Sequence, residues 1–172
     1  MTGKRIVLIT GGQRSGKSRY AERLALGLSD RPVYLATSRI WDEEFRQRVH
    51  RHQANRGPQW ENIEEEKYLS RHQLDGRVVV IDCVTLWGTN FFFDNDSDVD
   101  RSLTELKEEF DRLMTQNAYL IFVTNEIGLG GVSPDAVQRK FTDLQGWLNQ
   151  YIASSADEVV LMVSGIPLKI KE

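Results

Sequence analysis

The sequence predicts an α/β fold in which helices flank a mostly parallel central sheet and the chain ends in an antiparallel hairpin. Apolar, β-branched runs alternate along the 172 residues with segments of helical periodicity, the pattern of parallel strands connected by helices. A glycine-rich loop joins the first apolar run to the first helical segment. The last two apolar runs lie too close together for a parallel crossover, which takes about a dozen residues, so we expect a hairpin.

Two strands and two helices are expected in the first third of the chain. The strands are short apolar runs at Arg5–Thr10 and Val33–Ala36. The first helix follows the glycine-rich loop from Ser18 and reaches about Leu28. The second runs from Asp42 to about Arg56, because three side chains recur there on one side of a helix: Phe45, Val49 and His52.

The rest of the chain continues the alternation of strands and helices. Further strands are expected at Val78–Asp82, Tyr119–Val123, Glu158–Val163 and Ile166–Ile170, with Gly165 between the last two. A helix is expected over Val99–Gln116, where apolar side chains recur with helical periodicity at Leu103, Leu106, Phe110 and Leu113. Another helix is expected from Pro134 to Ala156, since proline suits the first turn of a helix.

Composition narrows the classes of protein to which the chain can belong. The formal net charge is -3, so the chain lacks the basic excess of a nucleic-acid binder. A single cysteine permits no internal disulfide, which fits the reducing cytoplasm. No apolar stretch approaches the roughly 20 residues that span a bilayer. We therefore expect one cytoplasmic domain over residues 1–172 that binds no nucleic acid and does not span a membrane.

The glycine-rich loop carries the strongest functional signal. Residues 11–18 read GGQRSGKS and match the phosphate-binding pattern G-x-x-x-x-G-K-[ST], between an apolar strand and a helix. The backbone amides of such a loop and the helix N-terminus bind phosphate oxygens, while Lys17 reaches the β- and γ-phosphates and Ser18 binds Mg²⁺. We therefore expect a P-loop NTPase fold of the RecA-like type, with the nucleotide held by Gly11, Gly12, Gln13, Arg14, Ser15, Gly16, Lys17 and Ser18.

Two acidic residues close apolar strands and are candidates for the edge of the sheet where ligands bind. Asp82 ends a β-branched run, and a P-loop site that holds Mg²⁺ usually has a carboxylate at the end of a nearby strand. We expect Asp82 to serve the metal with Ser18, although a turn-forming aspartate is the alternative. Glu126 follows the strand Tyr119–Val123, and a ligand contact and a simple loop start both stay open for it.

The histidines His50 and His52 lie in a basic segment. On a helix they lie about 200° apart, which disfavours a zinc pair. Arg48, His52 and Arg56 follow one another at four-residue spacing and share a helical face. A neutral imidazole flanked by arginines could attack a phosphorus atom while the arginines hold the phosphate charge. The alternative is an ordinary solvated basic face.

Two further segments have more than one reading. The acidic segment Asp94–Asp98 resembles a calcium loop but lacks its glycine and distal glutamate, so we expect a solvated turn. The aromatic run Phe91–Phe93 is expected to pack in the core. Alternatively, the run could form part of a subunit interface or an apolar surface that contacts a bulky ligand.

Six segments, in order along the chain, together resemble one enzyme family. They read TGGQRSGKSR at 10–19, YLATS at 34–38, RVHRHQANRGPQW at 48–60, DCVTLWGTN at 82–90, TNEIGLG at 124–130 and ADEVVLMVSGIPLKIK at 156–171. The chain resembles the bifunctional adenosylcobinamide kinase / adenosylcobinamide-phosphate guanylyltransferases of cobalamin biosynthesis over nearly its whole length.

The resemblance implies two reactions and their substrates. A nucleoside triphosphate, ATP or GTP, phosphorylates adenosylcobinamide with Mg²⁺ as the expected cofactor. GTP then transfers GMP to a histidine, and adenosylcobinamide phosphate takes the GMP from it, which splits one displacement into two. The resemblance also implies a homotrimer.

The resemblance further implies roles for individual residues. The family pattern R-[IV]-x-x-H fits Arg48, Val49 and His52, so His52 is expected to carry GMP, whereas His50 comes two residues too early. With Lys17, His52 forms the expected catalytic pair. Nucleotide contacts are also implied outside the P-loop, at Thr37, Ser38, Arg39, Asn55, Arg56, Gly57, Pro58, Glu64 and Asp82.

Two other functions remain open on the residues alone. One is a single-function P-loop kinase of a small molecule, in which His52 is only structural. The other is a nucleotide-switched ATPase or GTPase that acts as a binding protein and needs no nucleophilic histidine.

Overall fold

The computed structural model describes residues 3–172 and contains a seven-stranded sheet in the order β3-β2-β4-β5-β1-β6-β7. The strands are β1 (Arg5–Gly11), β2 (Val33–Ala36), β3 (Glu61–Glu64), β4 (Val78–Asp82), β5 (Tyr119–Val123), β6 (Glu158–Val163) and β7 (Ile166–Lys171). The helices are α1 (Lys17–Leu28), α2 (Glu43–Arg56), α3 (Val84–Asp94), α4 (Val99–Leu113) and α5 (Ala136–Ser155), with a 3₁₀ turn at Leu69–Arg71.

The sheet is parallel except at its last strand. All neighbouring pairs from β3 to β6 run parallel, and β7 alone pairs antiparallel, with β6. Ser164 and Gly165 form the two-residue turn of that hairpin, both at positive φ, 52° and 79°, as a tight hairpin turn requires. The predicted α/β class and the C-terminal hairpin are therefore confirmed.

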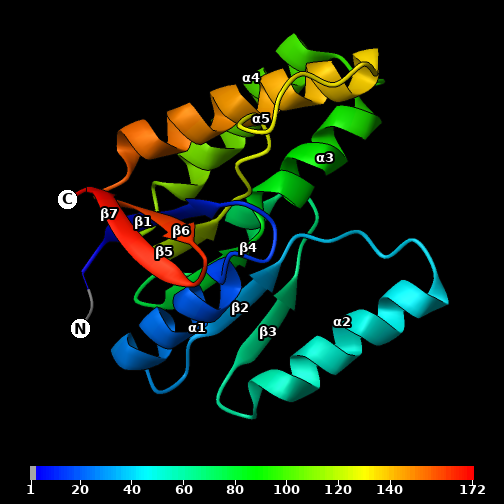
Figure 1. Cartoon of the computed structure of the whole chain (residues 1–172). Coiled ribbons are helices and arrows are strands. Elements are labelled where there is room, and N and C mark those ends of the chain that lie inside the picture. Colours follow the sequence, from blue (N-terminus) through cyan, green and yellow to red (C-terminus); the bar gives the residue numbers. More distant parts are fainter. Residues whose placement is uncertain (1–2) are drawn as a thin grey trace.

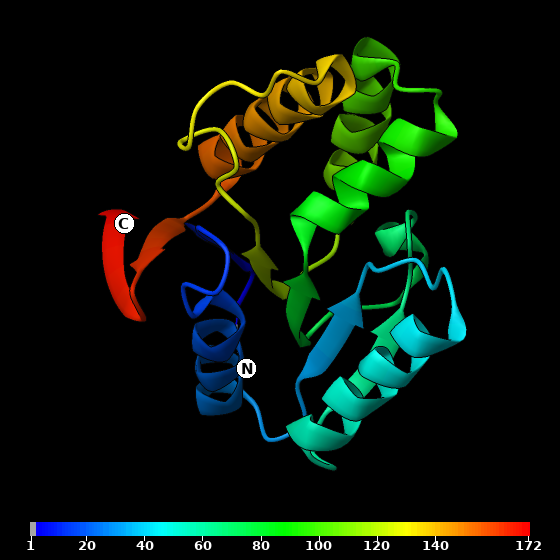
Figure 2. The same ribbon diagram turned by 45° about the vertical axis from the view of Figure 1, so that its right-hand side comes forward.

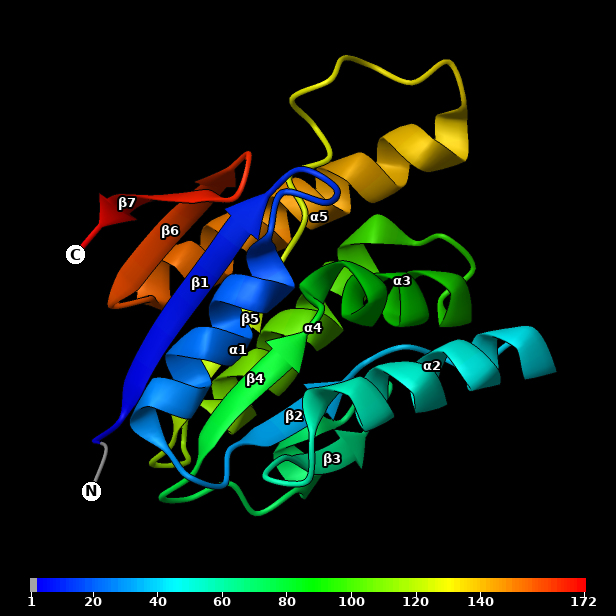
Figure 3. The same ribbon diagram turned by 60° about the horizontal axis from the view of Figure 1, so that its bottom comes forward.

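Helices cover both faces of the sheet (Figures 1 and 2). One face is covered by α3, α4 and α5, whose buried side chains include Trp87, Phe110 and Leu148. The other face carries α1, which buries Ala21 and Ala25 against the sheet, and α2, which contributes no buried residue. Figure 3 shows α1 near the central strands β1, β4 and β5, and α2 further out, near β2 and β3. No helix within residues 3–172 is long and apolar enough to cross a membrane.

Two elements were missing from the sequence prediction, and some boundaries were wrong. Strand β3 is a polar edge strand that alternates half-buried and exposed residues, so it lacks an apolar run. Helix α3 buries six of its eleven residues and therefore has no amphipathic stripe.

Helix α5 begins at Ala136, because the Asp135 side chain accepts a hydrogen bond from the Gln138 amide at 2.7 Å and caps the helix. Pro134 thus lies before the helix, and α4 ends at Leu113 instead of Gln116.

The acidic segment Asp94–Asp98, which begins at the last residue of α3, is only partly the expected solvated turn. Asp94 accepts hydrogen bonds from Arg39 at 2.8 Å and from Lys67 at 3.1 Å. The bonds from Arg39 contribute most to lowering the pKa of Asp94, to about 2. Asp98 caps α4 by accepting from the Arg101 amide at 2.9 Å. The first and last acids of the segment therefore hold neighbouring elements in place.

The aromatic run at the end of α3 packs as expected for two of its three residues. Phe91 and Phe92 are buried, whereas Phe93 is 54% exposed. We expect Phe92→Ala to lower the free energy of unfolding by about 3–5 kcal/mol, because it leaves a cavity beside Phe141, whose ring lies 5.5 Å away. Urea denaturation of this variant beside Phe93→Ala measures the difference. Equal losses for the two variants would contradict the burial pattern.

Candidate functional site

The loop between β1 and α1 forms the phosphate-binding geometry that its sequence predicts. Gly16 precedes α1 with φ 97°, and a Cβ added there would lie 3.3 Å from the Cα of Gly165 in the β6–β7 turn. Lys17 begins the helix, is 7% exposed and donates from Nζ to the carbonyl oxygen of Gly12 at 2.5 Å. Burial lowers the pKa of Lys17, although Asp82 opposes this shift. The Lys17 amine therefore lies across the loop that connects β1 to α1.

Ser18 and Asp82 meet at the carboxyl edge of the sheet. Ser18 follows β1 and Asp82 ends β4, and β5 lies between these two strands. The Ser18 hydroxyl donates to Oδ2 of Asp82 at 2.8 Å, and the Tyr34 hydroxyl donates to the same oxygen. Burial contributes most to raising the pKa of Tyr34, and the nearby Asp82 charge adds to it, so the phenol stays protonated as a donor. The structure therefore brings together the two residues that the sequence assigned to Mg²⁺.

A cavity of about 390 Å³ opens beside this pair, between α1 and α2. Residues of β2, β4, α1 and α2 line it, together with Leu86 of α3. Its lining combines acids, arginines and a histidine with a few apolar side chains: Ser18, Glu22, Tyr34, Ala36, Ser38, Phe45, Arg48, Val49, His52, Arg56, Asp82 and Leu86. A compound in this cavity would lie directly beside phosphates held on the P-loop.

The helical conformation of residues 43–56 separates the two neighbouring histidines. Asp42 caps α2 by accepting from the Phe45 amide at 2.8 Å. His52 lines the cavity with Ser18 and Asp82, together with Arg48 and Arg56. His50 instead lines a different hollow on α2, beside Glu43, Arg46, Gln47 and Arg51. Of this pair, His52 is the one that faces the P-loop site.

Stacking and polar contacts, without buried apolar side chains, hold α2 against the sheet. The Arg56 guanidinium lies 3.6 Å from the ring centroid of Tyr34, whose ring meets Trp60 edge-on at 5.8 Å. Arg56 also donates to Asn62 at 2.9 Å, and Gln53 donates to Glu64 at 3.1 Å. Within the described residues, Nε of Arg56 is buried without a hydrogen-bond partner. A buried charged donor of this kind is suited to an anionic ligand.

Some residues that the resemblance implied for nucleotide binding do not line this cavity. Thr37 is fully buried, and its hydroxyl donates to the carbonyl oxygen of Cys83 at 2.7 Å and accepts from the Cys83 amide at 3.0 Å. Arg39 pairs with Glu66 and Asp94, both at 2.8 Å, and its guanidinium lies 5.7 Å from the ring of Trp41. Both residues thus hold the fold around the site instead of facing it.

The other implied contacts lie around α2. Asn55 lines a second hollow together with Arg14 of the P-loop and with His52. Glu64 accepts from Gln53, and Gly57 and Pro58 follow the C-terminus of α2 outside the cavity lining. The Glu126 amide donates to the carbonyl oxygen of Gly11 at 2.9 Å, so the backbone of Glu126 braces the P-loop from the next strand.

Glu22 is a cavity residue that the sequence reasoning missed. It lies four residues after Ser18, so the two side chains share one face of α1, and this spacing was the signal that could have found it. Burial raises the pKa of Glu22, and Asp82 raises it further, while Arg56 and His52 lower it. Tyr34 was also missed, because in the sequence it is one more aromatic residue of a buried strand.

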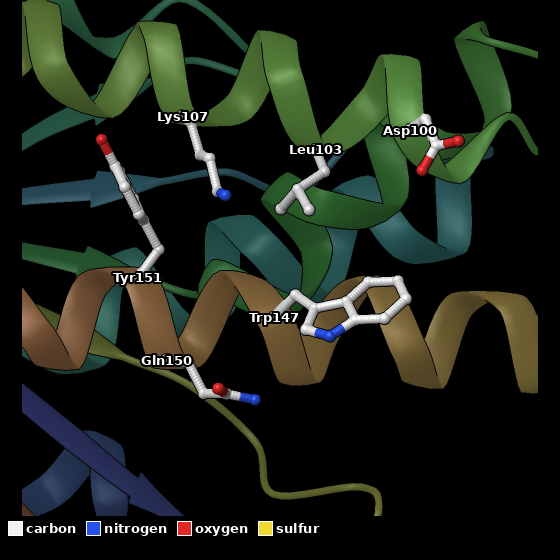
Figure 4. A pocket seen from close by; sticks show the side chains of 6 residues that line it. All are labelled: Asp100, Leu103, Lys107, Trp147, Gln150 and Tyr151. Atoms are coloured by element: carbon white, nitrogen blue, oxygen red, sulfur yellow. The ribbon is translucent and has the colours of Figure 1, made fainter.

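Another hollow lies between α4 and α5, on the opposite face of the sheet (Figure 4). It measures about 500 Å³ and is lined by Asp100, Leu103, Lys107, Trp147, Gln150 and Tyr151. The Lys107 amine lies 4.9 Å from the Tyr151 ring, and Tyr151 donates to Asp111 at 2.7 Å. Its lining includes no residue of the P-loop, so the cavity beside the P-loop is the better candidate site.

Comparison with known proteins finds a matching family model and similar bifunctional proteins. Residues 7–170 match the family model described as cobinamide kinase / cobinamide phosphate guanyltransferase. The bifunctional adenosylcobalamin biosynthesis protein CobU of Escherichia coli is 38% identical over 96% of this chain and 99% of its own length. The corresponding protein CobP of Pseudomonas aeruginosa is 38% identical over 95% and 96%.

Similar solved structures include proteins with other functions. The flagellar accessory protein FlaH of Methanocaldococcus jannaschii is 15% identical, with a TM-score of 0.46 over 97% of this chain and 78% of that one. A further solved structure, described as an ATPase domain, has a TM-score of 0.44 over 92% of this chain and 69% of its own, also at 15% identity.

Proposed function

The chain belongs to the cobinamide kinase / cobinamide phosphate guanyltransferase family, and from this premise we propose that both reactions of this bifunctional enzyme occur in the cavity between α1 and α2. The observation that carries the proposal is the position of His52, which lines that cavity together with Ser18 and Asp82. A nucleotide on the P-loop and a nucleophile on α2 then face one another.

The proposed kinase site uses the P-loop and one metal ion. Lys17 and the loop amides hold the β- and γ-phosphates. The Ser18 hydroxyl and the Asp82 carboxylate, 2.8 Å apart, offer the hard oxygen ligands that Mg²⁺ prefers, so these two residues fit the ion. When bound, Mg²⁺ neutralises the charge that develops on the phosphoryl oxygens. ATP or GTP is the proposed phosphate donor, and adenosylcobinamide the acceptor.

The proposed guanylyl transfer proceeds through a covalent intermediate on His52. A ring nitrogen of neutral His52 attacks the α-phosphorus of GTP, the bond to the bridging oxygen breaks, and pyrophosphate leaves with the electron pair. An oxygen of adenosylcobinamide phosphate then attacks the same phosphorus and releases His52. Arg48 and Arg56 lie on the same face of α2 and line the cavity, where their guanidinium groups stabilise the phosphate charge.

The mass of the intact protein after incubation with GTP and Mg²⁺ tests this proposal. We expect an added mass of one GMP that is labile to acid and stable to base, as a phosphorus–nitrogen bond is. Peptide mapping is expected to locate the adduct on His52, and incubation with ATP provides the nucleotide control. Absence of an adduct in the wild-type protein, or an adduct on another residue, would overturn the proposed intermediate.

The assembly and location of the enzyme are also proposals that rest on its family. We propose a homotrimer that acts in the cytoplasm on adenosylcobinamide and adenosylcobinamide phosphate. Light scattering of the purified protein measures the assembly directly, and a monomer at micromolar concentration would contradict the trimer.

A further inference from the structure

Glu22 lines the cavity and has no role in either proposed reaction so far. Its side chain is half-buried and lines the α1 wall, one helical turn after Ser18. Within residues 3–172, no cation lies within ion-pair distance of its carboxylate, and no hydrogen bond to it is formed. A carboxylate that is partly removed from water without a partner costs stability, and such groups concentrate at functional sites.

The carboxylate of the neighbouring acid, Asp82, already has hydrogen-bond partners and a proposed role. Its Oδ2 accepts hydrogen bonds from both Ser18 and Tyr34, and the same carboxylate is the proposed metal ligand. A carboxylate that is held by two donors and a cation is a poor proton acceptor, because each of these favours its ionised form. Of the two acids that line the cavity, Glu22 is therefore the one with its oxygens available.

The position of Glu22 also suits the acceptor substrate. The transferred phosphoryl group is held where α1 begins, at Lys17 and Ser18, and the space next to it is the cavity between α1 and α2. An alcohol that enters this cavity must bring its hydroxyl toward that end of α1. Glu22 lines the same cavity one turn further along the helix, so its carboxylate is available to accept the proton of a hydroxyl that enters there.

We propose that Glu22 is the general base of the kinase reaction. The hydroxyl oxygen of cobinamide forms a bond to the γ-phosphorus, the bond from that phosphorus to the β–γ bridging oxygen breaks, and the nucleoside diphosphate leaves with the electron pair. The hydroxyl proton passes to the Glu22 carboxylate and from there to solvent. The inference rests on the proposed placement of the kinase reaction in this cavity.

The test compares Glu22→Gln and Glu22→Asp with Glu108→Gln, an exposed glutamate on α4, on the opposite face of the sheet. We expect Glu22→Gln to lower kcat for cobinamide phosphorylation by about 100-fold or more, with KM for cobinamide changed much less. Glu22→Asp keeps a carboxylate and is expected to recover at least about a tenth of the wild-type kcat. Thermal melting of each variant confirms folding.

Formation of the GMP adduct distinguishes this role from a structural one, because it requires His52 but no alcohol. We expect Glu22→Gln to form the adduct at close to the wild-type rate. A kinase kcat within about threefold of wild type, an equally inactive Glu22→Asp, or parallel loss of both reactions would each overturn the role of Glu22. Failure of the proposed intermediate is seen separately, as absence of the adduct in wild type and Glu108→Gln alike.

Discussion

His52→Ala is expected to abolish guanylyl transfer and to spare the kinase reaction. Removal of a covalent nucleophile lowers the rate of its reaction by on the order of 10⁶-fold where no other group can replace it. The kinase reaction uses the P-loop, the metal ligands, the proposed base Glu22 and an acceptor, none of which His52 provides. The measurement is the rate of GMP-adduct formation from GTP, followed by intact mass, beside the rate of cobinamide phosphorylation.

His50→Ala is the matched control, since it removes the same side chain two residues away. His50 lines a hollow with Glu43 and Arg46, away from Ser18 and Asp82, so its loss is expected to leave both rates within about twofold of wild type. Helix α2 buries no residue, and neither substitution is expected to unfold it. The assignment fails if His50→Ala loses the adduct, or if His52→Ala retains it.

The fold was largely predictable because its central strands are locally distinct. Strands β1, β4 and β5 are continuous buried apolar runs, as expected for strands covered on both faces. Strand β3 and helix α3 were missed for opposite reasons. The residues of β3 are too polar to stand out, and those of α3 are buried on too many sides to show a helical stripe. Both depend on tertiary packing, which overrides local pattern.

The site was most predictable where its chemistry is local in the sequence. The P-loop is one continuous motif, so its strand, loop and helix follow from residues 5–28. The cavity, by contrast, depends on how α2 lies against the sheet, which the stacking of Arg56 on Tyr34 fixes. No spacing rule connects those two residues. For the same reason the sequence could not show that Arg39 turns toward Glu66 and Asp94.

Lys17→Ala is expected to impair both reactions together. The amine is the cation of the P-loop, and it lies against the Gly12 carbonyl across the loop that cradles the phosphates. Loss of one preorganised charged contact to a transferring phosphoryl group lowers kcat by about 100- to 1,000-fold. If one loop binds the nucleotide in both reactions, phosphorylation and adduct formation fall to a similar extent. Both rates are measured on one preparation, with the exposed Lys140→Ala on α5 as control.

The stability of the Lys17 variant separates this chemical effect from unfolding. Burial lowers the pKa of Lys17, which means that the folded protein carries the charged amine at a cost at neutral pH. Removing that charge is therefore expected to leave the melting temperature unchanged or higher, while activity is lost. Lys17→Met retains most of the side-chain volume and repeats the comparison without a cavity. Adduct formation that survives in either variant while phosphorylation is lost would mean that GTP binds for guanylyl transfer at a second site, independent of the P-loop.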